Sequence, residues 1–162
     1  MFKKRICLSL LSVFVLCSIS FPAFSADTTP FKFCFWPNAS IPSTDSVRGM
    51  NMGFIDYGNS VVGVELGLFS ITKYLVGGQL VFINAGGTLK GINLAALNFV
   101  KRTQGVQVGV YNDAATLASG GQIGIVNRTI DGKGMQFGLV NIMDNGFAHV
   151  FPFINFPKNW FK

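Results

Sequence analysis

GVQVGVYN at 105–112, GGQIGIVN at 120–127 and GMQFGLVN at 134–141 are three copies of one eight-residue unit, and they decide the fold. Related copies begin at Gly49, Gly63, Gly77, Gly91 and Ala148, with the sequences GMNMGFID, GVELGLFS, GGQLVFIN, GINLAALN and AHVFPFIN. The spacing is 14 residues throughout, apart from one additional residue between Asn112 and Gly120. A fixed period indicates one structural unit stacked on copies of itself.

Each copy alternates between apolar and other residues. The second, fourth and sixth positions are apolar in almost every copy, as at Val106, Val108 and Val110, whereas the third position is polar in seven of the eight copies. This alternation, rich in Val, Ile and Phe, is typical of a β-strand. Each copy ends on Asn, Asp or Ser, and these residues favour turns. We therefore predict strands that end at polar corners.

The fold class that we predict is an all-β repeat protein, a β-solenoid of about eight 14-residue coils with aromatic end caps. In that fold the second, fourth and sixth positions fill the core, the third and fifth positions face outward, and equivalent residues stack at about 4.8 Å. The alternative is an up-and-down meander or barrel of eight to nine antiparallel strands. Strands running up and down have different surroundings and favour a 28-residue super-period, which the sequence lacks. An outer-membrane version of the barrel would turn its apolar positions toward lipid.

Stacking of equivalent residues predicts two ladders of amide side chains. The first is a flat outer strip that could bind a partner, and the second is a structural ladder at the corners. The candidate binding face consists of Gln79, Gln107, Gln122 and Gln136. The corner ladder consists of Asn84, Asn98, Asn112, Asn127, Asn141 and Asn155.

Residues suited to catalysis or metal binding are sparse. His149 is the one histidine, and the seven acidic residues are spread singly along the chain. We therefore predict no catalytic residues, no metal site and no cofactor, and hence no enzyme. The positive charges are scattered through the loops between copies, without a basic stripe and interleaved aromatic residues, so we expect no nucleic-acid partner.

The N-terminus has the pattern of an export signal. Lys3, Lys4 and Arg5 precede an apolar run, and Ala23-Phe24-Ser25 supplies a small-x-small cleavage site. The domain organisation that we predict is a signal peptide at 1–25, an aromatic strand and loop at 26–48, tandem repeats at 49–147 and a capping repeat and tail at 148–162. Cleavage would remove two of the three cysteines and leave Cys34 unpaired.

The repeats, the lead-in FKFCFWPNASIPSTDSVRGM and the closing NGFAHVFPFINF resemble a family of exported bacterial surface-repeat proteins. Those proteins carry tandem G-x-Q-x-G-x-x-N units after an aromatic strand that ends in Pro. The resemblance implies an exported, non-enzymatic protein of the cell surface, outer membrane, periplasm or extracellular space, with a structural or adhesive role. We expect a protein or glycan as its partner; membrane association follows only from the alternative, a small outer-membrane β-barrel.

Overall fold

The computed structural model of the chain describes residues 28–36 and 39–160, and this part is all-β. Its strands are β1 (Thr29–Trp36), β2 (Ala39–Ile41), β3 (Ser46–Gly132), β4 (Met135–Met143) and β5 (Val150–Asn155). They form one sheet in the order β2-β1-β3-β4-β5. The all-β class predicted from the alternation is confirmed. The predicted signal peptide at 1–25 lies outside the described residues.

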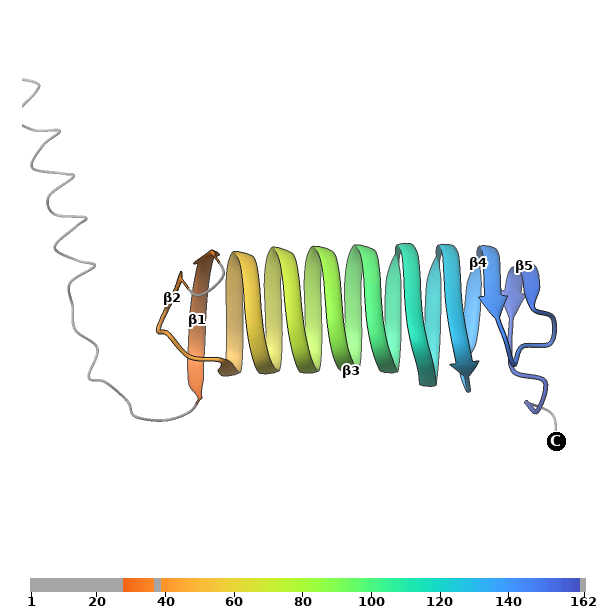
Figure 1. The fold of residues 1–162 in the computed structure, drawn as a ribbon, viewed down its shortest axis with the longest axis horizontal. Helices are drawn as coiled ribbons and strands as arrows, with labels where there is room; N and C mark the ends of the chain where they lie inside the picture. Colours follow the sequence, from red (N-terminus) through yellow and green to blue (C-terminus); the bar gives the residue numbers. More distant parts are fainter. Residues whose placement is uncertain (1–27, 37–38, 161–162) are drawn as a thin grey trace, which may run out of the picture.

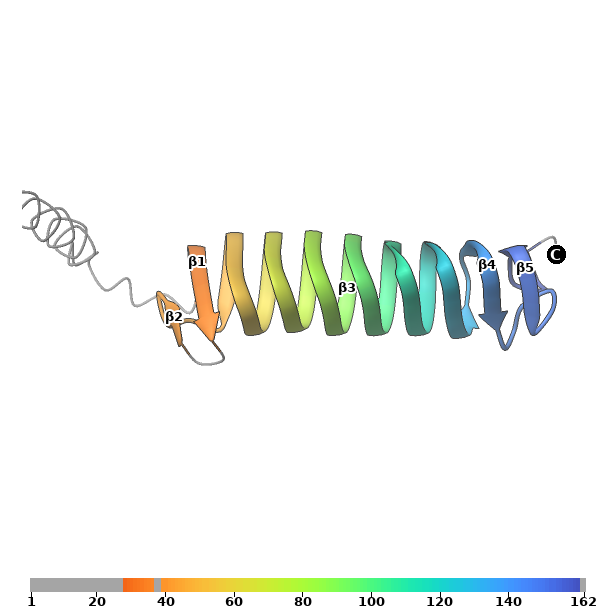
Figure 2. The same ribbon diagram turned by 90° about the horizontal axis from the view of Figure 1, so that it is seen from above.

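Strand β3 is a single 87-residue strand that winds around a common axis. Figures 1 and 2 show its successive turns side by side along the long axis of the molecule, with β1 and β2 at one end and β4 and β5 at the other. The strand continues through the expected corners, because Asn and Gly residues bend the backbone there without breaking the pairing between turns.

The pairing keeps equivalent residues of successive copies in register. Strand β4 lies parallel to the last turn of β3, with Gln122 opposite Gln136 and Asn127 opposite Asn141. Strand β1 is also parallel to β3 and places Lys32 opposite Asn51. These parallel pairings differ from the antiparallel neighbours that the meander alternative requires.

The side chains that face inward differ from those predicted. The second, fourth and sixth positions do not fill the core. Leu80 and Phe82 are 54% and 59% exposed, whereas Gln79, at the third position of the same copy, is buried. The thirteenth position supplies a buried apolar strip through Val61, Leu75 and Leu89. Alternation fixes which residues share a face of a strand but not which face turns inward, so the predicted sidedness is wrong.

The glycine at the first position of most copies marks a close approach between turns. Gly63, Gly77 and Gly91 have φ values of 139°, 131° and 130°, a region that side chains rarely adopt. A Cβ atom on Gly77 would overlap the carbonyl oxygen of Gly63 in the preceding turn. Both the backbone conformation and the spacing of turns therefore require glycine here.

The two ends depart from the regular repeat. At the N-terminal end, β2 pairs antiparallel with β1 through Phe33 and Ile41. At the C-terminal end, β5 pairs antiparallel with β4, with Phe153 opposite Gly138. The copy that begins at Ala148 is therefore not a further in-register turn, because the chain reverses its direction before β5.

The adjacent pair Gly77 and Gly78 offers a matched test of this packing. We expect Gly77→Ala to destabilise the fold by about 2 kcal/mol or more, because it combines a strained φ with a backbone clash. Gly78→Ala meets no atom within 4 Å and should stay within about 1 kcal/mol of the wild type. Thermal and urea unfolding followed by circular dichroism measures both; equal effects of the two substitutions would contradict the assigned close approach.

Candidate functional site

The glutamines predicted as a binding face lie inside the coil. Gln79 is 3% exposed, and Gln107, Gln122 and Gln136 are each 0% exposed. They are therefore out of reach of a surface partner, and the candidate binding face is corrected to an interior column. The physical reason is the reversed sidedness, which places the third position of every copy toward the axis.

Three of the interior glutamines, Gln107, Gln122 and Gln136, are hydrogen-bonded in series, whereas Gln79 donates to Glu65 and Ser70. Nε2 of Gln122 donates to Oε1 of Gln107 at 2.9 Å, and Nε2 of Gln136 donates to Oε1 of Gln122 at 2.8 Å. The hydroxyl of Thr129 donates to the same Oε1 of Gln122 at 2.8 Å. A buried amide is costly unless its polar atoms find partners, and stacking in register supplies them for both atoms of Gln122. Oε1 of Gln79, Nε2 of Gln107 and Oε1 of Gln136 are buried without a hydrogen-bond partner in the described part of the protein.

The corner asparagines form a second interior column. Asn98 donates to the side-chain oxygen of Asn112 at 2.8 Å, Asn112 donates to that of Asn127 at 2.9 Å, and Asn127 donates to that of Asn141 at 2.8 Å. Asn155 donates instead to the backbone oxygen of Ala148 at 2.9 Å, as expected from the reversed last strand. The asparagines at 84, 98, 112, 127, 141 and 155 are all buried.

The small fifth position makes room for this column. A Cβ atom on Gly124 would lie 2.6 Å from Nδ2 of Asn112, and one on Gly138 would lie 2.6 Å from Nδ2 of Asn127. The absence of a side chain at Gly109, Gly124 and Gly138, three residues before Asn112, Asn127 and Asn141, thus leaves a space that the amide of the preceding coil fills. The repeated G-x-x-N element is a packing requirement rather than a ligand motif.

Charged groups enter the interior near the N-terminal end. Nζ of Lys32 lies 3.1 Å from Oδ1 of Asp56 in a buried ion pair. The thiol of Cys34 donates to the same oxygen at 2.8 Å, and Nδ2 of Asn51 donates to Oδ2 of Asp56 at 2.6 Å. The carboxylate of Asp56 therefore holds three donors from β1 and the first turn of β3.

The pKa shifts in this cluster follow from burial and from Asp56. Burial alone lowers the pKa of Lys32, but the attraction of Asp56 and of the Cys34 thiol outweighs it, so the pKa is raised. Burial, together with the hydrogen bond to Asp56, raises the pKa of Cys34 to about 12. The thiol is therefore protonated and buried at neutral pH, which makes it a structural donor rather than a nucleophile.

Glu65 occupies the place in the third-position column that most copies give to an amide. It is 1% exposed and accepts a hydrogen bond from Nε2 of Gln79 at 3.0 Å. Burial raises the pKa of Glu65 to about 7, an effect that Ser70 opposes by hydrogen bonding and that Asp56 reinforces by repulsion. Near neutral pH this carboxyl group is only partly ionised.

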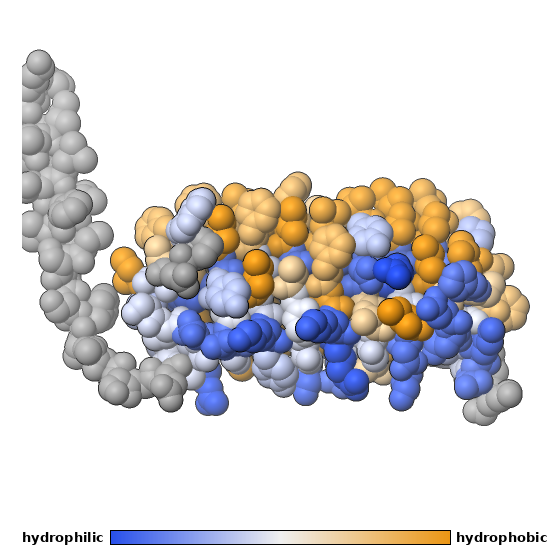
Figure 3. Space-filling model, in the orientation of Figure 1, coloured by the Kyte–Doolittle hydropathy of each residue, from blue (hydrophilic) through white to orange (hydrophobic). Residues whose placement is uncertain are grey.

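The outer surface carries the apolar residues that were expected to form the core. Figure 3 shows apolar residues along one side of the coil and hydrophilic residues along the other. We define the apolar side as the second, fourth, sixth and seventh positions of the copies at 49–140, where the hydroxyl of Tyr111 is the one polar side-chain group. Its most exposed members are Met50, Phe54, Val64, Leu68, Phe69, Leu80, Phe82, Ile92, Leu94, Val110, Ile123, Ile125, Phe137, Leu139 and Val140.

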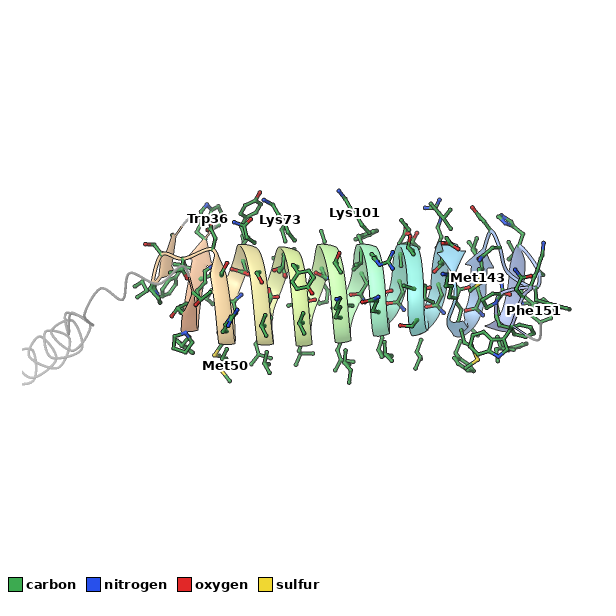
Figure 4. All side chains as sticks on the ribbon, turned by 90° about the horizontal axis from the view of Figure 1, so that it is seen from below. Trp36, Met50, Lys73, Lys101, Met143 and Phe151 are labelled. Atoms are coloured by element: carbon green, nitrogen blue, oxygen red, sulfur yellow. The ribbon has the colours of Figure 1, made fainter. Side chains whose placement is uncertain are left out.

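Two groups of cations lie outside the apolar side. The charged side contains Lys73, Lys101 and Arg102, at the eleventh and twelfth positions. Figure 4 shows Lys73 and Lys101 projecting away from the coil on the side opposite to Met50. The basic margin consists of Arg48, Lys90 and Lys133 at the fourteenth position, exposed and two residues from the edge of the apolar side.

A shallow groove of about 500 Å³ runs across the turns beside the charged side. Its lining includes Gly86 and Gly87, at positions where the neighbouring turns carry larger side chains, together with Phe99, Lys73 and Lys101. It is open to solvent and could accept part of a surface partner.

Three comparisons find no relative of this chain: no family model, no curated protein and no solved structure matches it. Within residues 28–36 and 39–160, no group of three or more His, Cys, Asp or Glu side chains could hold a metal ion. The same part of the chain contains no helix that is long and apolar enough to cross a membrane.

Two features of the site were not found from the sequence. The sequence predicts the apolar outer side as core, because alternation alone does not determine which face of the strand turns inward. The cluster of Lys32, Cys34 and Asp56 depends on the pairing of β1 with β3, which lies outside the 14-residue period.

Glu65→Gln tests the charge in the interior column. Because its pKa is raised from 4.5 to about 7, Glu65 favours folding below pH 4.5, and this contribution is lost as the pH rises through about 7. We expect Glu65→Gln to raise the melting temperature at pH 8 relative to the wild type and to flatten the pH dependence between these values. The measurement is thermal unfolding from pH 4 to 8, with Asp131→Asn on the exposed surface as the control. A lower melting temperature of Glu65→Gln at pH 8 would contradict the assignment.

Proposed function

We propose that this chain is an exported, non-enzymatic protein of the bacterial envelope or cell surface, built as a β-solenoid, with a structural or adhesive role. The observation that carries the proposal is the side-chain distribution of the repeat. The Gln and Asn side chains are buried in the interior columns, while apolar side chains are exposed along the whole length of the outside. A surface of this kind presents one chemistry repeatedly rather than a single reactive centre.

The stacking of copies supports the solenoid. The asparagine column links residues 14 or 15 apart, and the parallel register of β3 and β4 has the same 14-residue offset. The resemblance to exported surface-repeat proteins agrees with such an architecture. The predicted signal peptide at 1–25 supports export.

The use of the polar residues supports a role other than catalysis. Gln107, Gln122 and Gln136 donate or accept within the column, and the Cys34 thiol donates to Asp56. Groups engaged in this way are not presented to a substrate. A protein or glycan partner would therefore contact the outer surface and not the glutamine column.

A small outer-membrane protein is the second candidate, because its apolar exterior around a polar interior is the sidedness seen here. That candidate requires antiparallel strands, whereas β1, β3 and β4 pair in parallel. An envelope protein that exposes its apolar side while remaining a solenoid accounts for both observations.

Fractionation of bacteria that express the full chain with a C-terminal epitope tests the proposal. We expect the envelope fraction to contain a species whose mass corresponds to a chain beginning at Ala26 or Asp27. Leu11→Arg with Val15→Arg interrupts the apolar run of the signal and should keep the uncleaved chain in the cytoplasm. An uncleaved wild-type chain in the cytoplasm would overturn the proposal. Resistance to extraction by alkaline carbonate would favour the outer-membrane candidate.

A further inference from the structure

We propose that the apolar side docks on the surface of an anionic lipid bilayer, with the long axis of the coil parallel to the membrane plane. The inference rests on the proposed function only in taking the outer surface as the working surface, and it names lipid as the partner. It replaces the expectation that membrane association requires a barrel.

The composition of the apolar side favours lipid over a protein. A protein interface carries roughly one hydrogen bond per 100–200 Å². The apolar side offers the hydroxyl of Tyr111 and no charged or amide side chain over seven successive copies. Its backbone groups pair between turns, so they are not available to a partner. Such a surface gains free energy chiefly by leaving water, which the acyl region of a bilayer permits.

The extent of the apolar side fits a bilayer surface. Seven turns at about 4.8 Å each give a length of about 30 Å, and positions two to seven span about 17 Å along each turn. Phe54 near one end and Leu139 near the other are 55% and 61% exposed, so the exposure is not confined to one part of the coil. Apolar patches that extend this far mark interaction surfaces.

The charges decide the orientation and the lipid class. The basic margin of Arg48, Lys90 and Lys133 lies beside the apolar side and contains no acidic residue. On the other margin, Arg128 is paired with Asp113 at 3.2 Å. Cations next to an inserted apolar surface meet the headgroups, where each Lys or Arg adds about 1 kcal/mol of attraction to anionic lipid.

The charged side excludes an orientation across the membrane. Lys73, Lys101 and Arg102 lie along the coil rather than at its ends, and Figure 4 shows two of them opposite Met50. A transmembrane coil would place these cations in hydrocarbon, which is costly. With the axis in the membrane plane, they face water while the apolar side faces lipid.

Vesicle flotation of the purified chain from residue 26 onward tests the proposal. We expect the protein to float with vesicles of phosphatidylcholine and phosphatidylglycerol at 7:3 and to float less with phosphatidylcholine alone. Replacing Arg48, Lys90 and Lys133 by Ser should weaken the partition into anionic vesicles by roughly a hundredfold. The matched control replaces Lys73, Lys101 and Arg102 by Ser; it removes the same charge from the opposite side and should have a much smaller effect.

A second pair of variants tests the apolar contact. Leu80→Asp with Phe82→Asp should abolish flotation, whereas Ile71→Asp with Ala115→Asp, at exposed positions outside the apolar side, should not. Circular dichroism establishes that each variant remains folded. Absence of flotation with both vesicle types, equal losses in the two cation variants, or a stable dimer that hides the apolar side and does not bind lipid would each overturn the proposal. None of these results would alter the export experiment.

Discussion

The structure depends on the hydrogen bonding of amide groups inside a narrow coil. Once Asn98, Asn112 and Asn127 are buried, their amide groups need hydrogen-bond partners, and the Asn of the next turn accepts from each of them. Backbone carbonyl oxygens of the neighbouring turn, such as those of Ile123 and Phe137, accept as well. This requirement explains the strict 14-residue period. It also explains where the one additional residue occurs: it lies at the exposed Ser119 region, and Asn112 still reaches Asn127 although the two are 15 residues apart.

Filling the interior with amides leaves the apolar residues for the outside. The coil retains an apolar strip of Val61, Leu75 and Leu89, but most Val, Leu, Ile and Phe side chains of the repeat face outward. Their stacking on neighbouring turns stabilises the sheet, and the apolar area that they leave exposed indicates an interaction surface. The interior hydrogen bonds and the outer apolar side are therefore two consequences of one arrangement, and the outer side is where a function is expressed.

Periodicity was sufficient to predict the all-β class and the stacking of Asn98, Asn112, Asn127 and Asn141, because a 14-residue repeat of one alternating unit determines which residues are equivalent. Asn84 and Asn155, predicted in the same ladder, are buried but make no hydrogen bond to its side chains. It was insufficient to predict which face of the strand turns inward, since Gln107 and Val108 alternate in the same way in either case. The crowding of Gly124 against the amide of Asn112 resolves that ambiguity, and it exists only in three dimensions. The reversal of β5 and the contacts of Lys32 depend on the non-repeating ends, which no period describes.

Cysteine accessibility tests the polar interior and apolar exterior most directly. In the chain from residue 26 with Cys34→Ala, single variants Gln107→Cys and Val110→Cys probe neighbouring positions that are 0% and 51% exposed. Maleimide labelling, detected by mass spectrometry, should modify Val110→Cys rapidly and Gln107→Cys only after unfolding in urea. The single variants Ile123→Cys and Gln122→Cys provide a second exposed and buried pair in the next turn. Rapid labelling at 107 and 122 with protection at 110 and 123, in variants that remain folded, would contradict the arrangement.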